Sequence, residues 1–229
     1  MNEPTEHYDE TYFLGHYGRL INDGVYYELL ARYWAKAVFR GVKELEDIRR
    51  MRVLDYGCGT GVVTAALSNS SCFDVSPYAF KFLECKGRKV FGKSSEIPQA
   101  AFDVLVCSHS LEHYTNPLEM LIGFKNYLRP NGFLVLVLPI ERNFKPTISS
   151  DGDQHLYGWT FQSITNLLLF GGWRPCQAST IYGPFLLGSL GRKLLPPDLA
   201  VFFAHSLGRL KRGFASMRIV SRLVPPQTP

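Results

Sequence analysis

The stretch of sequence that decides the fold covers residues 51–61, MRVLDYGCGTG. Its first half is a short apolar run with β-branched character, which predicts a strand, and its second half places glycines at three alternate positions. The mostly apolar residues from Thr60 to Ser68 then predict a helix. A strand, a tight glycine turn and a helix let the backbone approach a nucleotide-like ligand. Glycine is required there because a Cβ would clash with the ligand or forbid a positive φ.

The spacing of the glycines distinguishes between kinds of nucleotide-binding loop. The dinucleotide fingerprint is G-x-G-x-x-G after a strand, whereas here Val62 occupies the position of the last glycine. No Lys-Ser or Lys-Thr pair follows the glycines, so the phosphate-binding loop (P-loop) of nucleoside triphosphatases is excluded. Residues 53–61, VLDYGCGTG, closely resemble the first motif of the class I methyltransferases that use S-adenosylmethionine, V-L-D-x-G-C-G-T-G. The alternative is a plain strand-to-helix turn without a ligand.

The resemblance implies that S-adenosylmethionine is the cofactor and that the motif holds it. The motif residues expected at the cofactor are Asp55, Gly57, Cys58, Gly59 and Gly61.

A second acid supports this assignment. Asp74 belongs to a predicted strand over residues 72–75 and follows Asp55 by about 20 residues, a spacing at which an acid can take ribose hydroxyls. In the family, an acid at the end of the second strand holds the ribose. We therefore expect Asp74 and its neighbour Val75 at the nucleoside; a turn or helix N-cap role is the alternative for Asp74.

The fourth predicted strand, residues 102–108, is almost continuously apolar, as expected of a strand buried on both faces. Together with the residues after it, FDVLVCSHSLEH, it resembles a second family signature, F-D-x7-L-E-H. Ligands of open α/β sheets bind beyond the carboxyl ends of the strands, so Ser108 and His109 are also expected at the cofactor.

The loop over residues 94–98 corresponds to one that, in the family, often carries an acid in contact with the adenine amino group. The position at which this acid is expected holds Lys93 here. Ser95, Glu96 or the backbone would therefore contact the adenine.

Two histidines are candidates for a general base. His113 is the first, because imidazole titrates near neutral pH and the residue lies just past the fourth strand. His155, in a polar loop after residue 139, is the second, and for both the alternative is a structural role. A base is needed only if the acceptor must lose a proton. Glu112 with His113 could bind a divalent ion, as in some relatives, but two adjacent ligands are too few, so we expect no metal.

Aromatic residues are frequent in the first 50 residues, which predict helices after a polar start. The family often uses this region as a lid over the cofactor. Tyr12 and His16 are the residues expected to face the pocket, whereas a helix pair packed on the sheet edge is the alternative for most of these aromatic side chains.

Strands and helices alternate through the rest of the chain, which predicts an α/β fold with a doubly wound, mostly parallel seven-stranded sheet. A late antiparallel strand would complete the sheet of the family. We expect one domain over 1–229, with a helical lid (1–50), a cofactor-binding core (51–182), a basic amphipathic insertion (183–213) and a last strand (214–224). The predicted strands are 51–56, 72–75, 89–91, 102–108, 133–139, 174–182 and 215–223, and the predicted later helices are 60–68, 77–86, 117–127 and 161–170.

Composition limits the partners and the compartment. With 46% hydrophobic residues the chain can bury an ample core, and its five cysteines form no C-x-x-C pair, which favours a reducing compartment and predicts a cytoplasmic protein. The first residues are polar and do not resemble a signal peptide. No apolar run reaches the length of about 18 residues that is needed to cross a bilayer, so we expect no transmembrane span.

The net charge of +5 is concentrated at the end of the chain, where residues 183–229 hold seven Lys and Arg residues but one acid. We therefore predict no nucleic-acid partner. Residues 192–214 could cap the acceptor pocket, contact an anionic membrane surface or pack on the domain, and the oligomeric state stays open.

These observations predict an S-adenosylmethionine-dependent methyltransferase that acts on a small molecule, at oxygen or nitrogen. The alternative from another class is a methyltransferase-shaped binding or scaffold protein without turnover. A nicotinamide oxidoreductase is disfavoured by Val62.

Overall fold

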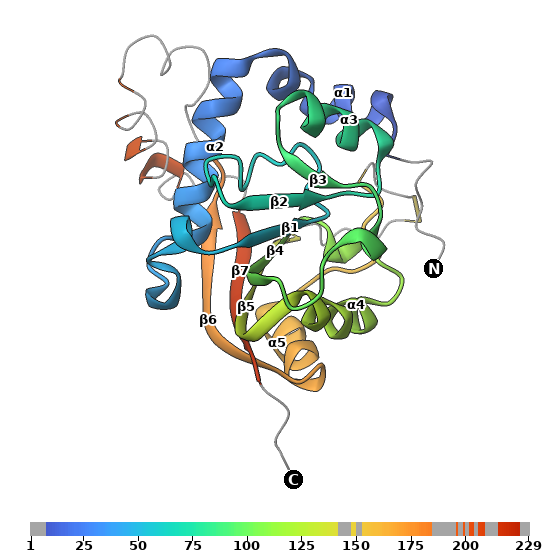
Figure 1. Cartoon of the computed structure of the whole chain (residues 1–229), viewed down its shortest axis with the longest axis vertical. Coiled ribbons are helices and arrows are strands. Elements are labelled where there is room, and N and C mark those ends of the chain that lie inside the picture. The colour runs from blue at the N-terminus through green and yellow to red at the C-terminus, as the bar shows by residue number, and fades with distance from the viewer. Residues whose placement is uncertain are drawn as a thin grey trace.

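A computed structural model of the chain describes residues 8–141, 148–149, 153–184, 196, 199, 202–203, 206–208 and 215–224. These residues contain a seven-stranded sheet of order β3-β2-β1-β4-β5-β7-β6 (Figure 1). Strands β1 to β5 are parallel, and β7 is antiparallel to both β5 and β6. The predicted sheet with its late antiparallel strand is confirmed. The strands are β1 (Val53–Tyr56), β2 (Ser70–Phe73), β3 (Lys89–Phe91), β4 (Phe102–Ser108), β5 (Leu128–Pro139), β6 (Trp173–Tyr182) and β7 (Ala215–Leu223).

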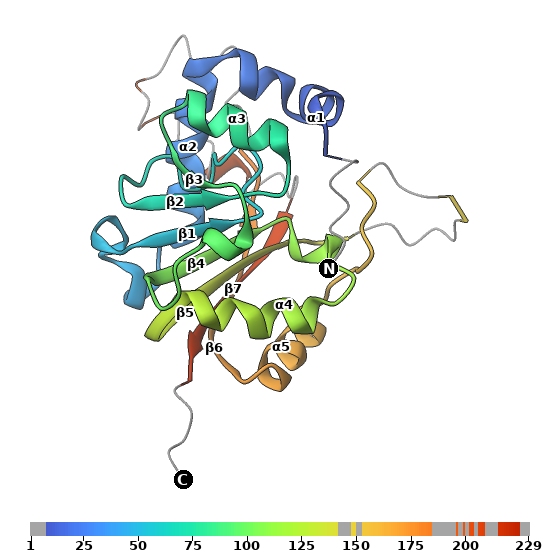
Figure 2. The same ribbon diagram turned by 45° about the vertical axis from the view of Figure 1, so that its right-hand side comes forward.

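Helices cover both faces of the sheet (Figure 2). The side chains of β4 and β5 alternate between these two faces. Valines of these two strands pack against Val38 and Phe39 of α2. Leucines at the intervening positions pack against Phe124 of α4 and Leu168 of α5. This period of two explains why both strands have continuously apolar sequences. The helices are α1 (Glu10–Asn22), α2 (Gly24–Phe39), α3 (Pro77–Cys85), α4 (Pro117–Phe124) and α5 (Phe161–Phe170).

A buried arginine of β7 holds the C-terminal end of α2 against the sheet. Arg218 is 5% exposed, and its Nη1 donates to the carbonyl oxygens of Val38 at 3.0 Å and Arg40 at 2.9 Å. The last carbonyls of a helix lack partners within the helix and form its negative end, so a cation is favourable there. This contact fixes α2, and with it the neighbouring helix α1, relative to the sheet.

The predicted helix over residues 60–68 is wrong. The chain there forms successive tight turns, with the amides of Gly61, Thr64 and Leu67 each donating to the carbonyl three residues earlier. Two physical reasons explain the difference. Gly61 has φ +66°, outside the helical region, and the β-branched residues that follow it are poor helix formers.

Other boundaries differ from the predictions by a few residues. The second strand ends at Phe73, so Asp74 is the first residue beyond the sheet. Strand β5 begins at Leu128 and includes the predicted turn, where Asn131 has φ +64°. Helix α4 ends at Phe124 and is followed by a 3-10 turn.

Most of the 183–213 insertion lies outside the described residues. Of the apolar side chains expected on its amphipathic face, Leu199, Phe202 and Phe203 are described and are exposed. In the described part of the chain, no helix combines the length and the apolar character needed to cross a bilayer.

Candidate active site

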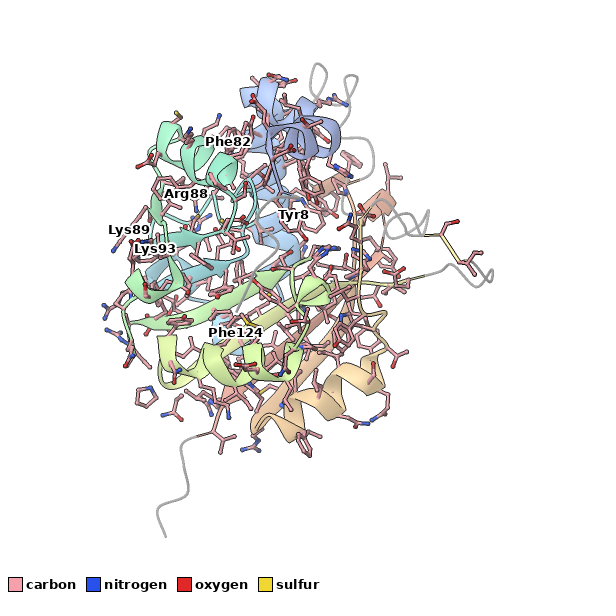
Figure 3. All side chains as sticks on the ribbon, turned by 90° about the vertical axis from the view of Figure 1, so that its right-hand side faces the viewer. Tyr8, Phe82, Arg88, Lys89, Lys93 and Phe124 are labelled. Atoms are coloured by element: carbon pink, nitrogen blue, oxygen red, sulfur yellow. The ribbon has the colours of Figure 1, made fainter. Side chains whose placement is uncertain are left out.

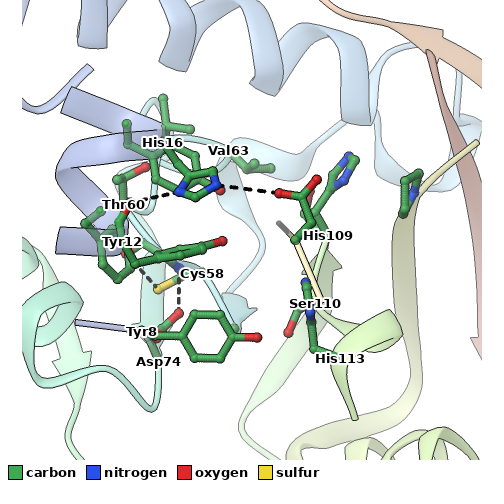
Figure 4. Close-up of a pocket in the computed structure, with 18 of the residues that line it drawn as sticks. Tyr8, Tyr12, His16, Cys58, Thr60, Val63, Asp74, His109, Ser110 and His113 are labelled. Atoms are coloured by element: carbon green, nitrogen blue, oxygen red, sulfur yellow. Dashed lines mark hydrogen bonds and ion pairs between the residues drawn. The ribbon is translucent and has the colours of Figure 1, made fainter. Parts of the chain in front are cut away.

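A cavity of about 660 Å³ lies between α1 and the carboxyl ends of β1, β2 and β4 (Figure 4). Its volume is within the range of roughly 300–1,000 Å³ that is usual for small-molecule and cofactor sites. Its walls come from α1, the glycine loop after β1, the ends of β2 and β4, and the segment after β5. Among the predicted site residues, the cavity is lined by Tyr12, Gly57, Cys58, Gly59, Asp74, Val75, Ser108, His109, His113 and His155.

The three glycines of the loop have different structural reasons. All have positive φ, from +54° to +66°. A Cβ on Gly57 would lie 2.1 Å from Oγ of Ser110, and one on Gly61 would lie 2.6 Å from Cδ2 of Leu83. A Cβ on Gly59 would meet only the Phe13 ring, at 3.7 Å. Gly59 therefore leaves open space on the cavity side, where a ligand can approach the backbone.

Asp74 connects the loop to the second strand. Its Oδ2 accepts a hydrogen bond from the Gly59 amide at 2.7 Å, and its Oδ1 accepts one from the Ser76 amide at 3.0 Å. Burial raises the pKa of Asp74, while these backbone hydrogen bonds act in the opposite direction. A carboxylate has about four acceptor positions, so both oxygens can still accept hydroxyl groups from the cavity.

Four of the predicted cofactor residues lie outside the cavity lining: Asp55, Gly61, Ser95 and Glu96. Asp55 is fully buried beneath the loop, where its Oδ2 accepts from Thr64 Oγ1 at 2.8 Å and burial raises its pKa to about 6. Glu96 accepts from the amides of Gly92 and Lys93 and so closes its own turn. The structure gives Asp55 and Glu96 contacts within the protein rather than with the cavity.

Arg88, which the sequence did not indicate, holds the turns that replace the expected helix (Figure 3). Its guanidinium donates to the Gly61 carbonyl at 3.2 Å, Thr64 Oγ1 at 3.1 Å and Ser70 Oγ at 2.8 Å. These contacts tie the end of the glycine loop to the start of β2. Arginine suits this position because its planar group offers five donors in a fixed arrangement.

A cluster of imidazoles and carboxylates forms the opposite wall, and we name it the histidine cluster: His109, Glu112, His113, Glu141 and His155. The rings of His113 and His155 have centroids 5.0 Å apart. Glu112 lies behind them with 0% exposure, and neither of its oxygens accepts a hydrogen bond from another described residue. One nitrogen each of His109 and His155 lies 3.9 Å from Glu112 Oε1. Burial raises the pKa of Glu112 to about 7.

The outer members of the histidine cluster are oriented by hydrogen bonds. Nδ1 of His155 lies 2.6 Å from Oε1 of Glu141. Because a carboxylate only accepts, we assign the hydrogen of this contact to Nδ1, and Nε2 is the acceptor atom when the ring carries a single hydrogen. His109 has φ +49°, and its Nε2 lies 2.9 Å from Oγ of Ser216. Burial lowers the pKa of His109 to about 4, so this ring is neutral at pH 7.

Helix α1 closes over the cavity through His16. The His16 ring stacks on Tyr12, with centroids 4.4 Å apart, and its Nδ1 donates to the Tyr12 carbonyl at 3.0 Å. Its Nε2 lies 3.7 Å from Oδ1 of Asp153, which belongs to the segment after β5. Asp153 was not among the predicted site residues. The sequence did not indicate it because its contact with His16 joins segments that are far apart in the chain.

Comparison with known proteins gives one family. A family model described as a methyltransferase domain matches residues 27–182. A ubiquinone biosynthesis O-methyltransferase of Histophilus somni is 26% identical over an alignment of 121 residues that covers 45% of this chain and 50% of that protein. The chain thus spans about half the length of this curated relative.

Two solved structures share the fold. An S-adenosylmethionine-dependent methyltransferase of Thermotoga maritima has a TM-score of 0.62 at 12% identity, covering 93% of this chain and 97% of that one. The 1,6-didemethyltoxoflavin-N1-methyltransferase of Burkholderia thailandensis, solved with 1,6-didemethyltoxoflavin and S-adenosylhomocysteine, has a TM-score of 0.58 at 18% identity. The structural match covers 94% of this chain and 87% of the Burkholderia protein. At these identities the likeness concerns the fold.

Proposed function

This chain belongs to the class I S-adenosylmethionine-dependent methyltransferase family, and on that premise we propose that it transfers a methyl group to oxygen or nitrogen of a small aromatic molecule. The resemblance predicted from residues 53–61, with S-adenosylmethionine as cofactor, is confirmed by the family model. The observation that supports the proposal most is the single cavity that the glycine loop, Asp74 and the histidine cluster share.

The loop side of the cavity fits the cofactor. The open space beside Gly59 admits a ligand against the backbone, and Asp74 offers acceptors for the ribose hydroxyls. When bound, S-adenosylmethionine supplies an electrophilic methyl group on a sulfonium sulfur. The protein has to hold the acceptor in line with that methyl group and exclude water. Such alignment can lower a barrier by about 7–11 kcal/mol.

The histidine cluster can take the proton that an acceptor hydroxyl or amine releases. Nε2 of His155 is available as an acceptor because Glu141 binds the Nδ1 hydrogen. The paired carboxylate also stabilises the imidazolium that forms. His113, whose ring lies 5.0 Å from His155, is the second candidate for this role.

The lining of the cavity suggests a flat, largely apolar acceptor. Tyr8, Tyr12 and Tyr17 line it together with the imidazoles. Tyr8 meets His113 edge-to-face, with centroids 5.9 Å apart. Aromatic walls favour aromatic ligands through stacked and edge-to-face contacts. The curated relative named as an O-methyltransferase favours oxygen, whereas the Burkholderia protein is named for methylation at N1.

We further propose that α1 acts as a lid. The contact of His16 with Asp153 joins α1 to the segment after β5 on the far side of the cavity. Opening this contact would admit the cofactor and acceptor, and closing it would exclude water.

Two measurements test the proposed function. Isothermal titration of the purified chain with S-adenosylhomocysteine is expected to show one site per chain. Incubation with methyl-labelled S-adenosylmethionine and a panel of hydroxylated and aminated aromatic compounds is expected to give labelled product with an equal amount of S-adenosylhomocysteine. Binding without turnover across the panel would favour a binding protein, and a folded chain that ignores S-adenosylhomocysteine would overturn the proposal.

A further inference from the structure

The innermost part of the histidine cluster has the composition of a metal site. Glu112, His113 and His155 each offer one ligand atom, and these atoms all lie within 4.8 Å of one another. Two ligand atoms at about 2.1 Å from a tetrahedral ion lie about 3.4 Å apart. Small side-chain rotations would therefore bring the three residues onto one ion.

The burial of Glu112 and the surroundings of its carboxylate oxygens are a second, independent indication of a bound cation. Its side chain is 0% exposed, and neither oxygen accepts a hydrogen bond from another described residue. The imidazole nitrogens of His109 and His155 that lie nearest, at 3.9 Å, are beyond hydrogen-bond distance. A buried carboxylate without such a partner is strongly unfavourable unless it is protonated or binds a metal ion.

We propose that Glu112, His113 and His155 bind one divalent transition-metal ion of the zinc class, with its remaining positions open to the cavity. Two imidazoles and one carboxylate form a ligand set that zinc accepts in sites with an open position. Magnesium and calcium prefer oxygen ligands and are disfavoured here.

The contact between His155 and Glu141 fits this arrangement. A metal-bound histidine commonly donates its other ring N–H to a carboxylate, which fixes the ring and increases its basicity. His155 has this geometry, with Nδ1 2.6 Å from Glu141 and Nε2 directed toward Glu112 at 3.9 Å. Glu141 is thus a positioning residue for the ion.

The consequence for catalysis rests on the proposed function, whereas binding of the ion does not. With the ion bound, His113 and His155 would hold the metal in place of taking the acceptor's proton. The ion would lower the pKa of a hydroxyl group bound to it, and the proton would pass to solvent water before methyl transfer. An oxygen of the acceptor then completes the coordination, which selects an acceptor with a hydroxyl group next to the cofactor side of the cavity.

The experiment uses the full chain after treatment with a chelator and buffer exchange. Titration with Zn²⁺ is expected to show one ion per chain, and titration with Co²⁺ is expected to give the visible absorption of a site with nitrogen and oxygen ligands. Glu112→Gln and His155→Gln should each weaken Zn²⁺ binding at least 100-fold. The matched control Glu119→Gln, which changes an exposed carboxylate of α4 outside the cavity, should leave it unchanged.

Circular dichroism and S-adenosylhomocysteine binding are measured on the same samples, so that misfolded variants are recognised. A wild-type chain that binds S-adenosylhomocysteine but no Zn²⁺ would overturn the metal site and leave the proposed function standing. Zn²⁺ binding that the Glu112→Gln and His155→Gln variants retain would also overturn it. A chain that binds Zn²⁺ through these residues but ignores S-adenosylhomocysteine would support the site and contradict the proposed function.

Discussion

The backbone amide of Gly59 donates a hydrogen bond to Oδ2 of Asp74 across 2.7 Å. This contact joins the loop after β1 to the first residue beyond β2, so the two sequence features that indicated a nucleoside site form one structural unit. The shape of the loop and the position of the carboxylate therefore depend on each other, and a change in either is expected to affect cofactor binding.

Replacing Asp74 should weaken cofactor binding strongly. Asp74→Ala removes the acceptor for the Gly59 amide and for the ribose hydroxyls, and leaving such groups unpaired costs about 1–3 kcal/mol. Calorimetry should therefore show S-adenosylhomocysteine affinity lowered by roughly 5- to 150-fold. Asp103→Ala is the control, because Asp103, at the start of β4, forms an ion pair with Arg129 and does not line the cavity. Equal affinity in Asp74→Ala and the wild type would contradict the ribose assignment.

Alanine at two positions of the glycine loop should have different effects. Gly57→Ala places a Cβ against Ser110 in addition to a positive φ, and should lower the free energy of unfolding by at least about 2 kcal/mol. Gly59→Ala meets no close atom, so about 1 kcal/mol of backbone strain is expected, together with a larger loss of S-adenosylhomocysteine affinity. Urea denaturation and calorimetry separate the two effects. The reverse order would show that Gly59 does not face the ligand.

Arg88 should contribute to stability through its contacts with the turns after the loop. Arg88→Gln removes the donors to Gly61 and Thr64, and the free energy of unfolding should fall by about 1–3 kcal/mol in urea denaturation. Lys89→Gln, at the exposed neighbouring position, should change it by no more than about 0.5 kcal/mol. Similar values for the two variants would mean that the turns hold their shape without Arg88.

Asp55 should make stability depend on pH. Burial raises its pKa from 3.8 to about 6, against the opposing effects of Thr64 and Arg88. The folded state therefore favours the protonated acid, and this stabilising contribution is present below pH 3.8 and is lost as pH rises through about 6. Asp55→Asn cannot ionise, so its stability relative to the wild type should increase over this window, by at most about 3 kcal/mol. A difference that stays constant with pH in urea denaturation would contradict this account.

The sequence predicted the sheet, and it indicated the glycine loop and Asp74 that line one side of the cavity, because these features depend on local patterns. The apolar run of β4, the glycine spacing after β1 and the acid after β2 each lie within a short segment. The helix expected after Gly61 was wrong because positive φ at Gly61 and the β-branched residues after it favour turns, which Arg88 then holds from another element.

The other side of the site could be predicted only in part. His113 and His155 were singled out by residue type, but the sequence does not show that a buried Glu112 lies behind them and that Glu141 orients His155. The contact between His16 and Asp153 joins residues 137 positions apart, and Arg218 reaches the end of α2 from the last strand. These relationships arise from tertiary packing and have no signature in any one stretch of sequence.

The most direct test of the account is a crystal structure of the chain with S-adenosylhomocysteine. We expect the adenosine to lie against Gly57 and Gly59 with its ribose hydroxyls on Asp74, and the sulfur to face His113 and His155 across the cavity. A ligand bound elsewhere, or one whose ribose makes no contact with Asp74, would contradict the central claim.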